Sequence, residues 1–161
     1  VAKDSGAGDG GNDDGGNDDE NVDVPFTSNV ALAGVSSAYT DGVATVNGTE
    51  DIATLKFGTS KKHGEGTITL PAGTKTVRYY GVGWKGNSTT LEFSVNGSVV
   101  TTQAVVANDG ASGNAPYTMT VTASDCYTFS LPSALTAETT VTVKTTGSYR
   151  AIMFGINAYT K

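Results

Sequence analysis

Hydrophobic and polar residues alternate along most of the chain from Pro25 onward, and short runs of turn residues separate the alternating stretches. A period of two places successive side chains on opposite faces of a β-strand. No stretch of a dozen residues has the period of an amphipathic helix. The pattern therefore predicts strands at residues 29–35, 42–46, 51–58, 66–70, 75–84, 89–95, 98–106, 117–122, 126–131, 139–145 and 148–159.

The predicted strands are short and closely spaced, which is typical of two packed antiparallel sheets. The strongest local signal is Asn96-Gly97, because this pair favours a two-residue type I′ hairpin turn. We therefore expect an all-β, jelly-roll-like β-sandwich with an extended acidic N-terminal arm. In the last strand, Ile152, Phe154 and Ile156 are expected to share one face. The other predicted inward-facing residues are Ile68, Leu70, Leu91, Phe93, Val95, Tyr127, Phe129, Leu131, Val141 and Val143.

Composition supports an all-β class. The 161 residues include 25 threonines, and threonine is a β-branched residue that favours strands over helices. The apolar runs are only a few residues long, whereas a membrane-spanning helix needs about 18 or more, so no membrane span is expected. The chain has one histidine and one cysteine, which excludes a disulfide framework and most zinc sites.

The formal net charge of −6 is unevenly distributed. Residues 1–24 contain eight acidic residues and one basic residue, whereas residues 25–161 contain eight acidic and nine basic residues. We therefore divide the chain into an acidic arm, residues 1–24, and a nearly neutral β-sandwich domain, residues 25–161. The arm would repel phosphate and the domain has no basic stripe, so nucleic-acid binding is not expected.

The acidic arm contains a short repeat. The sequence Asp-Gly-Gly-Asn-Asp occurs twice in residues 9–18, and a degenerate third copy follows in residues 19–23. Such residues cannot bury a core and their charges repel one another, so one interpretation is an extended tether. The alternative is Ca²⁺ binding through carboxylate and amide oxygens, although the spacing matches neither an EF-hand nor a β-roll repeat. The candidate ligands would be Asp9, Asp13, Asp14, Asp18, Asp19 and Asp23.

Several stretches of the domain carry a resemblance to a known class of protein. They are residues 55–58 (Leu-Lys-Phe-Gly), 66–71, 77–86, 91–97 and the closing run 150–159. Together they resemble the β-sandwich modules of Bacteroidetes-type surface lipoproteins, which are similar to galactose-binding-like and carbohydrate-binding jelly rolls. The acidic arm resembles the spacer that follows the lipid-bearing cysteine in such proteins. The resemblance implies an extracellular location at the cell surface.

Candidate catalytic residues are few. His63 lies in a polar link punctuated by glycines, where a solvated loop is the favoured interpretation. Cys126 is interpreted as a half-buried strand residue with a raised thiol pKa. Nothing in the sequence brings together two carboxylates for glycoside hydrolysis among Asp51, Glu65, Glu92 and Asp125. We expect no enzymatic activity.

The best binding candidate is the aromatic strand at residues 75–84. Arg78, Tyr80 and Trp84 share one face of it by parity. Flat aromatic rings flanked by hydrogen-bond donors are suited to the apolar faces and hydroxyls of sugars. The alternative interpretation is that Trp84, the only tryptophan, fills the sandwich core.

Two hypotheses of different classes follow. The first is a non-catalytic structural subunit of a cell-surface assembly, such as a filament, sheath or adhesive layer. Its arm would contact a neighbour, with the partner being a second copy or another surface protein. The second is a tethered carbohydrate-binding module with Trp84 exposed in a groove. The assembly hypothesis predicts that another chain covers Val24, Phe26, Val30 and Leu32.

Overall fold

The computed structural model describes residues 25–161, and these residues are built almost entirely of strands. The arm, including the six candidate calcium ligands and Val24, lies outside the described residues. The strands are β1 (Ala31–Ser36), β2 (Ala38–Tyr39), β3 (Val43–Val46), β4 (Thr49–Ala53), β5 (Leu55–Phe57), β6 (Glu65–Leu70), β7 (Thr76–Gly83), β8 (Thr89–Val95), β9 (Ser98–Val105), β10 (Tyr117–Met119), β11 (Cys126–Ser130), β12 (Thr139–Thr145) and β13 (Ala151–Tyr159). A single 3₁₀ turn, η2 (Ala123–Asp125), precedes β11 in this part of the chain.

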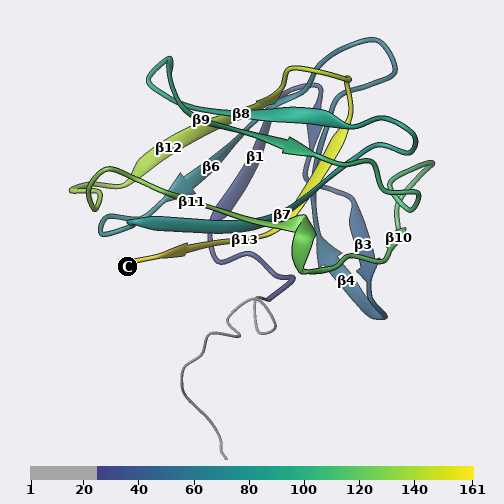
Figure 1. The fold of residues 1–161 in the computed structure, drawn as a ribbon, viewed down its shortest axis with the longest axis horizontal. Coiled ribbons are helices and arrows are strands. Elements are labelled where there is room, and N and C mark those ends of the chain that lie inside the picture. The colour runs from purple at the N-terminus through teal and green to yellow at the C-terminus, as the bar shows by residue number, and fades with distance from the viewer. Residues whose placement is uncertain (1–24) are drawn as a thin grey trace, which may run out of the picture.

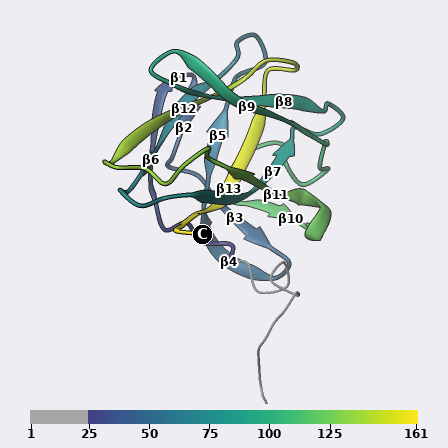
Figure 2. The same cartoon turned by 60° about the vertical axis from the view of Figure 1, so that its left-hand side comes forward.

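The strands form three layers (Figures 1 and 2). The first sheet has the order β1-β6-β12-β8-β9 and the middle sheet has the order β11-β7-β13-β5-β2. Both are antiparallel, so the predicted antiparallel β-sandwich is confirmed. A small sheet, β10-β3-β4, covers part of the other face of the middle sheet and contains one parallel pair, β10 with β3.

Two separate cores result from this arrangement. The inner core lies between the first and middle sheets, where Tyr79 and Phe93 pack with their ring centres 5.2 Å apart. The outer core lies between the middle and small sheets and includes Trp84. Because β7 and β13 contribute to both cores, these two strands are buried on both faces. No helix within residues 25–161 is long and apolar enough to cross a membrane.

Hairpin turns account for the register of two strand pairs. Asn96 and Gly97 have φ angles of 51° and 83° and join β8 to β9, which confirms the predicted turn. Asn47 and Gly48 have almost the same angles, 50° and 88°, and join β3 to β4. The strand predicted at residues 51–58 is in fact two strands, which separate at Thr54, where the hydroxyl donates to the carbonyl of Gly42 at 3.0 Å.

The prediction for the last strand is wrong for one residue. Ile152 and Phe154 lie in the outer core, but Ile156 lies in the inner core with Met153. The cause is an irregularity in the pairing of β13 with β7 between Phe154 and Asn157, where Gly155 has a φ of +58°. An added residue of this kind reverses the side-chain alternation beyond it.

The segment just after the arm adds hydrogen bonds along this part of β13. The hydroxyl of Ser28 accepts from the Ile156 N–H at 2.8 Å, and the Asn29 N–H donates to the Ile156 carbonyl at 3.1 Å. The amide of Asn157 donates to the carbonyl of Thr27 at 2.9 Å. The chain therefore enters the domain at the irregularity of β13.

The described residues of the predicted assembly set are half-buried within their own chain. Phe26 makes an edge contact with Tyr80, with ring centres 5.2 Å apart, and packs against the outer core. Val30 and Leu32 pack against the inner core. Their proposed contacts with a neighbouring chain stay a prediction.

Candidate functional site

Trp84 and Arg150 form the centre of the candidate site. Trp84 follows β7 and Arg150 precedes β13, and the Trp84 N–H donates to the Arg150 carbonyl at 3.3 Å, so the two residues lie opposite each other. The guanidinium carbon of Arg150 is 4.4 Å from the centre of the Trp84 ring. A planar cation at this distance is attracted to the electron-rich face of an indole.

A second cation approaches the same ring from the next strands of the middle sheet. Lys56 lies between Leu55 and Phe57 of β5, which both point into the inner core, so its own side chain points to the outer face. Its Nζ atom is 5.1 Å from the Trp84 ring and 5.4 Å from the ring of Tyr39, its partner on β2. We call Trp84, Arg150, Lys56 and Tyr39 the aromatic–cation row.

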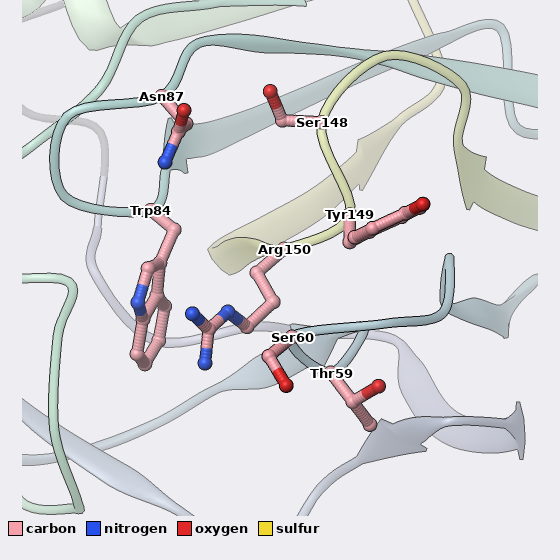
Figure 3. Close-up of a pocket in the computed structure, with 7 residues that line it drawn as sticks. All are labelled: Thr59, Ser60, Trp84, Asn87, Ser148, Tyr149 and Arg150. Atoms are coloured by element: carbon pink, nitrogen blue, oxygen red, sulfur yellow. The ribbon is translucent and has the colours of Figure 1, made fainter.

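Two cavities open beside this row. The Arg150 cavity has a volume of about 150 Å³, and Figure 3 shows the Arg150 guanidinium beside the Trp84 ring in it. The Lys56 cavity has a volume of about 220 Å³. The Arg150 cavity is lined by Thr59, Ser60, Trp84, Asn87, Ser148, Tyr149 and Arg150. The Lys56 cavity is lined by Tyr39, Asp41, Gly42, Lys56, Ala115 and Tyr117.

Hydrogen bonds in the neighbouring loops fix the lining of the Arg150 cavity. The hydroxyl of Thr89 donates to the Ser148 carbonyl at 2.7 Å and accepts from the Gly147 N–H at 3.2 Å. The Asn87 N–H donates to the Trp84 carbonyl at 2.8 Å and closes a tight turn. These bonds hold the loop backbone that carries the polar side chains of the cavity.

Tyr149 lies at the edge of the Arg150 cavity with 42% of its surface accessible, and its ring points away from Trp84 and Arg150 (Figure 3). Its ring makes an edge contact with His63 at 4.8 Å, and His63 Nε2 lies 2.8 Å from the Gly147 carbonyl oxygen. Gly58 packs beneath this loop with a φ of +84°, and a Cβ atom there would lie 1.9 Å from the Tyr149 carbonyl oxygen. A glycine is therefore required beside the ring.

The described part of the chain gives the two cations of the row little electrostatic compensation. Within residues 25–161, neither Lys56 nor Arg150 has a carboxylate within ion-pair distance, and the ion pair found there joins Lys144 to Glu92 at 3.4 Å. Burial lowers the pKa of Lys56 below its usual range, and the positive charge of Arg150 lowers it further. The row is consequently a positively charged patch between aromatic rings.

Comparison with known proteins identifies no family. No family model matches the chain, and no curated protein matches it. Among solved structures, CBM35 from Paenibacillus barcinonensis has a TM-score of 0.47 and 16% identity, covering 81% of this chain and 93% of its own. TmCBM61 in complex with beta-1,4-galactotriose has a TM-score of 0.43 and 13% identity over 87% of this chain and 93% of its own. The Carbohydrate-Binding Module CBM36 in complex with calcium and xylotriose has a TM-score of 0.41 and 10% identity, covering 78% and 89%.

The structure separates the three residues that the sequence grouped as a sugar-binding face. Trp84 lines the Arg150 cavity, but only 8% of it is exposed, because cations and Tyr117 surround its ring. Tyr80 is buried and stacks on Phe154, with ring planes 3° apart. Arg78 lies over the ring of Tyr159, six residues or about 20 Å along the strand from Trp84.

Sequence reasoning missed Arg150 and Lys56. Both have a detectable signal, because each is a cation in a strand region whose neighbours are apolar. Lys56 stands between the apolar residues Leu55 and Phe57 of β5. Arg150 immediately precedes the apolar residues that begin β13. What the sequence does not contain is the strand order that brings both of them to Trp84.

The candidate catalytic residues make separate local contacts. Glu92 pairs with Lys144, and the Asp125 carboxylate accepts from the Thr122 N–H at 3.0 Å as part of a capping box. Cys126 is half-buried, and burial raises the pKa of its thiol. Residues 25–161 contain no group of three or more histidine, cysteine, aspartate or glutamate side chains placed to hold a metal ion.

Proposed function

We propose that this chain is an extracellular, non-catalytic carbohydrate-binding module whose site is the Arg150 cavity. The observation that carries the proposal is the arrangement of an exposed ring, Tyr149, beside a polar cavity in which Arg150 lies against Trp84. A sugar ring presents apolar C–H faces and hydroxyl groups, so it needs a flat ring and several hydrogen-bonding groups in one place.

The cavity supplies both kinds of contact. Tyr149 offers its accessible ring, while Arg150 and Asn87 offer N–H donors. The hydroxyls of Ser60 and Ser148 can donate or accept. Trp84 positions the guanidinium through its cation–π contact and does not contact the sugar itself, because so little of its surface is accessible.

Binding of the full chain to an array of oligosaccharides tests this proposal. We expect Tyr149→Ala and Arg150→Gln each to weaken binding roughly tenfold or more, since each removes a direct contact. Arg78→Gln is the matched control, because it removes the other arginine, which lies about 20 Å away. Binding that depends on Arg78 and not on Arg150 would favour the face that the sequence grouped. An array with no bound glycan would contradict the proposal.

Self-association is a second candidate function, and β9 is the observation that favours it. This strand forms one edge of the first sheet, carries no charged residue, and leaves Val99 and Val100 54% and 41% exposed. An uncharged edge can add a strand from a second copy. Light scattering of the purified chain should then detect oligomers that Val99→Lys disperses. A monomer at all concentrations would remove this candidate.

A further inference from the structure

We propose that the glycan is acidic, and that its carboxylate or sulfate group binds between Arg150 and Lys56 with sugar rings in both cavities. This inference rests on the proposed function and adds the chemical class of the ligand. Its basis is the aromatic–cation row, which joins the Arg150 cavity to the Lys56 cavity across the outer face of the middle sheet.

Strand order brings the two cations to the same aromatic ring. β13 and β5 follow β7 in the middle sheet, so Arg150 and Lys56 come from the same side of β7, and the charge of Arg150 is close enough to act on Lys56. Each cation is within about 5 Å of that one ring. A carboxylate or sulfate group has several acceptor oxygens, so it can accept from the guanidinium and the ammonium together.

The unfavourable electrostatic free energy of two neighbouring cations also favours an anionic ligand. Lys56 is partly desolvated and is repelled by the charge of Arg150, and both effects lower its pKa. The rings of Trp84 and Tyr39 compensate only in part, because a cation–π contact is weaker than a charged hydrogen bond. An anion bound between the two cations would remove the repulsion.

The surroundings indicate a sugar and not an isolated anion. The cavities on both sides are lined by hydroxyl, amide and aromatic side chains, which are suited to rings that carry several hydroxyl groups. Asp41 is the one carboxylate among the described residues that line the two cavities. It is suited to accept a hydrogen bond from a sugar hydroxyl on the side away from the acidic group.

Calorimetry with pairs of oligosaccharides that differ only in charge tests the inference. The pairs are oligogalacturonate and its methyl ester, xylan oligosaccharides with and without glucuronate, and chondroitin sulfate before and after desulfation. We expect an acidic member to bind at least tenfold more tightly than its neutral counterpart, and its affinity to fall as salt rises. Inorganic phosphate and sulfate are added separately, and we expect them to compete only weakly.

Variants then locate the anion. Lys56→Gln and Arg150→Gln should each reduce the affinity for the acidic member roughly ten- to hundredfold. Lys56→Gln should leave the affinity for the neutral member almost unchanged. Lys144→Gln removes a charge from the first sheet and is the matched control. The thermal midpoint of each variant is measured, so that a loss of fold is recognised.

The outcomes separate the inference from the function on which it rests. Equal binding of acidic and neutral members, or unchanged affinity in Lys56→Gln, overturns the acidic ligand and leaves the carbohydrate-binding module in place. Inorganic phosphate that binds as tightly as the acidic sugars also overturns it, because the sugar rings would then contribute nothing. If no oligosaccharide of the panel or the array binds, both proposals fail.

Discussion

The two faces of the middle sheet are built from the same strands but have opposite character. The inner face is covered by the first sheet and packs apolar and aromatic side chains, with Tyr79 against Phe93 and Tyr127. The outer face is covered by the smaller sheet, and its uncovered part carries Arg150 and Lys56. Both covered areas form cores, and the incomplete cover of the outer face leaves charge beside aromatic rings at the edge of its core.

The comparison shows why β7 and β13 are the strands on which the candidate site depends. A strand that is buried on both faces is rigid, because its hydrogen bonds and side chains are fixed by neighbours on every side. Trp84 and Arg150 stand at the adjoining ends of these two strands, at the edge of the outer core, where Trp84 packs against Tyr117 of the small sheet. The site therefore shares Trp84 with the outer core and gains its geometry from it.

The largest expected effect is on the inner face. Phe93→Ala should lower the free energy of unfolding by about 3–5 kcal/mol, because it leaves a cavity between the two large sheets. Tyr39→Ala, in the half-covered row of the outer face, should cost about 1 kcal/mol or less. Urea unfolding measures both. Similar losses in the two variants would mean that the faces do not differ as described.

An intermediate effect is expected from alkaline pH. Burial raises the pKa of Tyr79 far above its usual value near 10, so the folded chain retains this proton after the unfolded chain has lost it. The stability contributed by neutral Tyr79 is complete below pH 10 and is lost as pH rises above 10. Tyr79→Phe should unfold less readily than the wild type between pH 10 and 11. Parallel pH curves for the two proteins would contradict this reasoning.

The smallest expected effect is on the outer face and has the opposite sign. The pKa of Lys56 is lower in the folded chain than its usual value near 10.5, so below that pH the unfolded chain binds the extra proton. Stability should therefore rise slightly with pH as Lys56 becomes neutral, and Lys56→Gln should lack this rise. The effect is small because the side chain is partly exposed to solvent. Urea midpoints from pH 8 to pH 10 measure it.

Much of the fold could be predicted from the alternation of residues. The strands predicted at residues 89–95 and 139–145 coincide with β8 and β12, and Asn96-Gly97 forms the expected turn. The alternation failed after Gly155, because the irregularity there depends on pairing with β7 and not on local preference. A Cβ atom at position 155 would lie 2.6 Å from the carbonyl oxygen of Pro25. This close approach is between residues that are 130 positions apart in the sequence, so no local pattern reports it.

The candidate site was less predictable than the fold. Trp84 was identified by residue type, but its partners come from strands that are distant in sequence and adjacent only in the sheet. Parity along one strand suggested Arg78, whereas the cation beside the ring is Arg150, which faces Trp84 across a strand pair. Side-chain alternation reports which face a residue occupies and carries no information about which strands are neighbours.

Strand β13 also has a mechanical consequence. It starts beside Arg150, and near Ile156 it is hydrogen-bonded to the segment by which the chain enters the domain, about 20 Å further on. A force applied between a ligand in the Arg150 cavity and residue 25 would run lengthwise along this strand. The hydrogen bonds that join β13 to β7 and β5 would then be loaded together in shear instead of opening one after another. Such a force would therefore pass through a strand that is buried over most of its length.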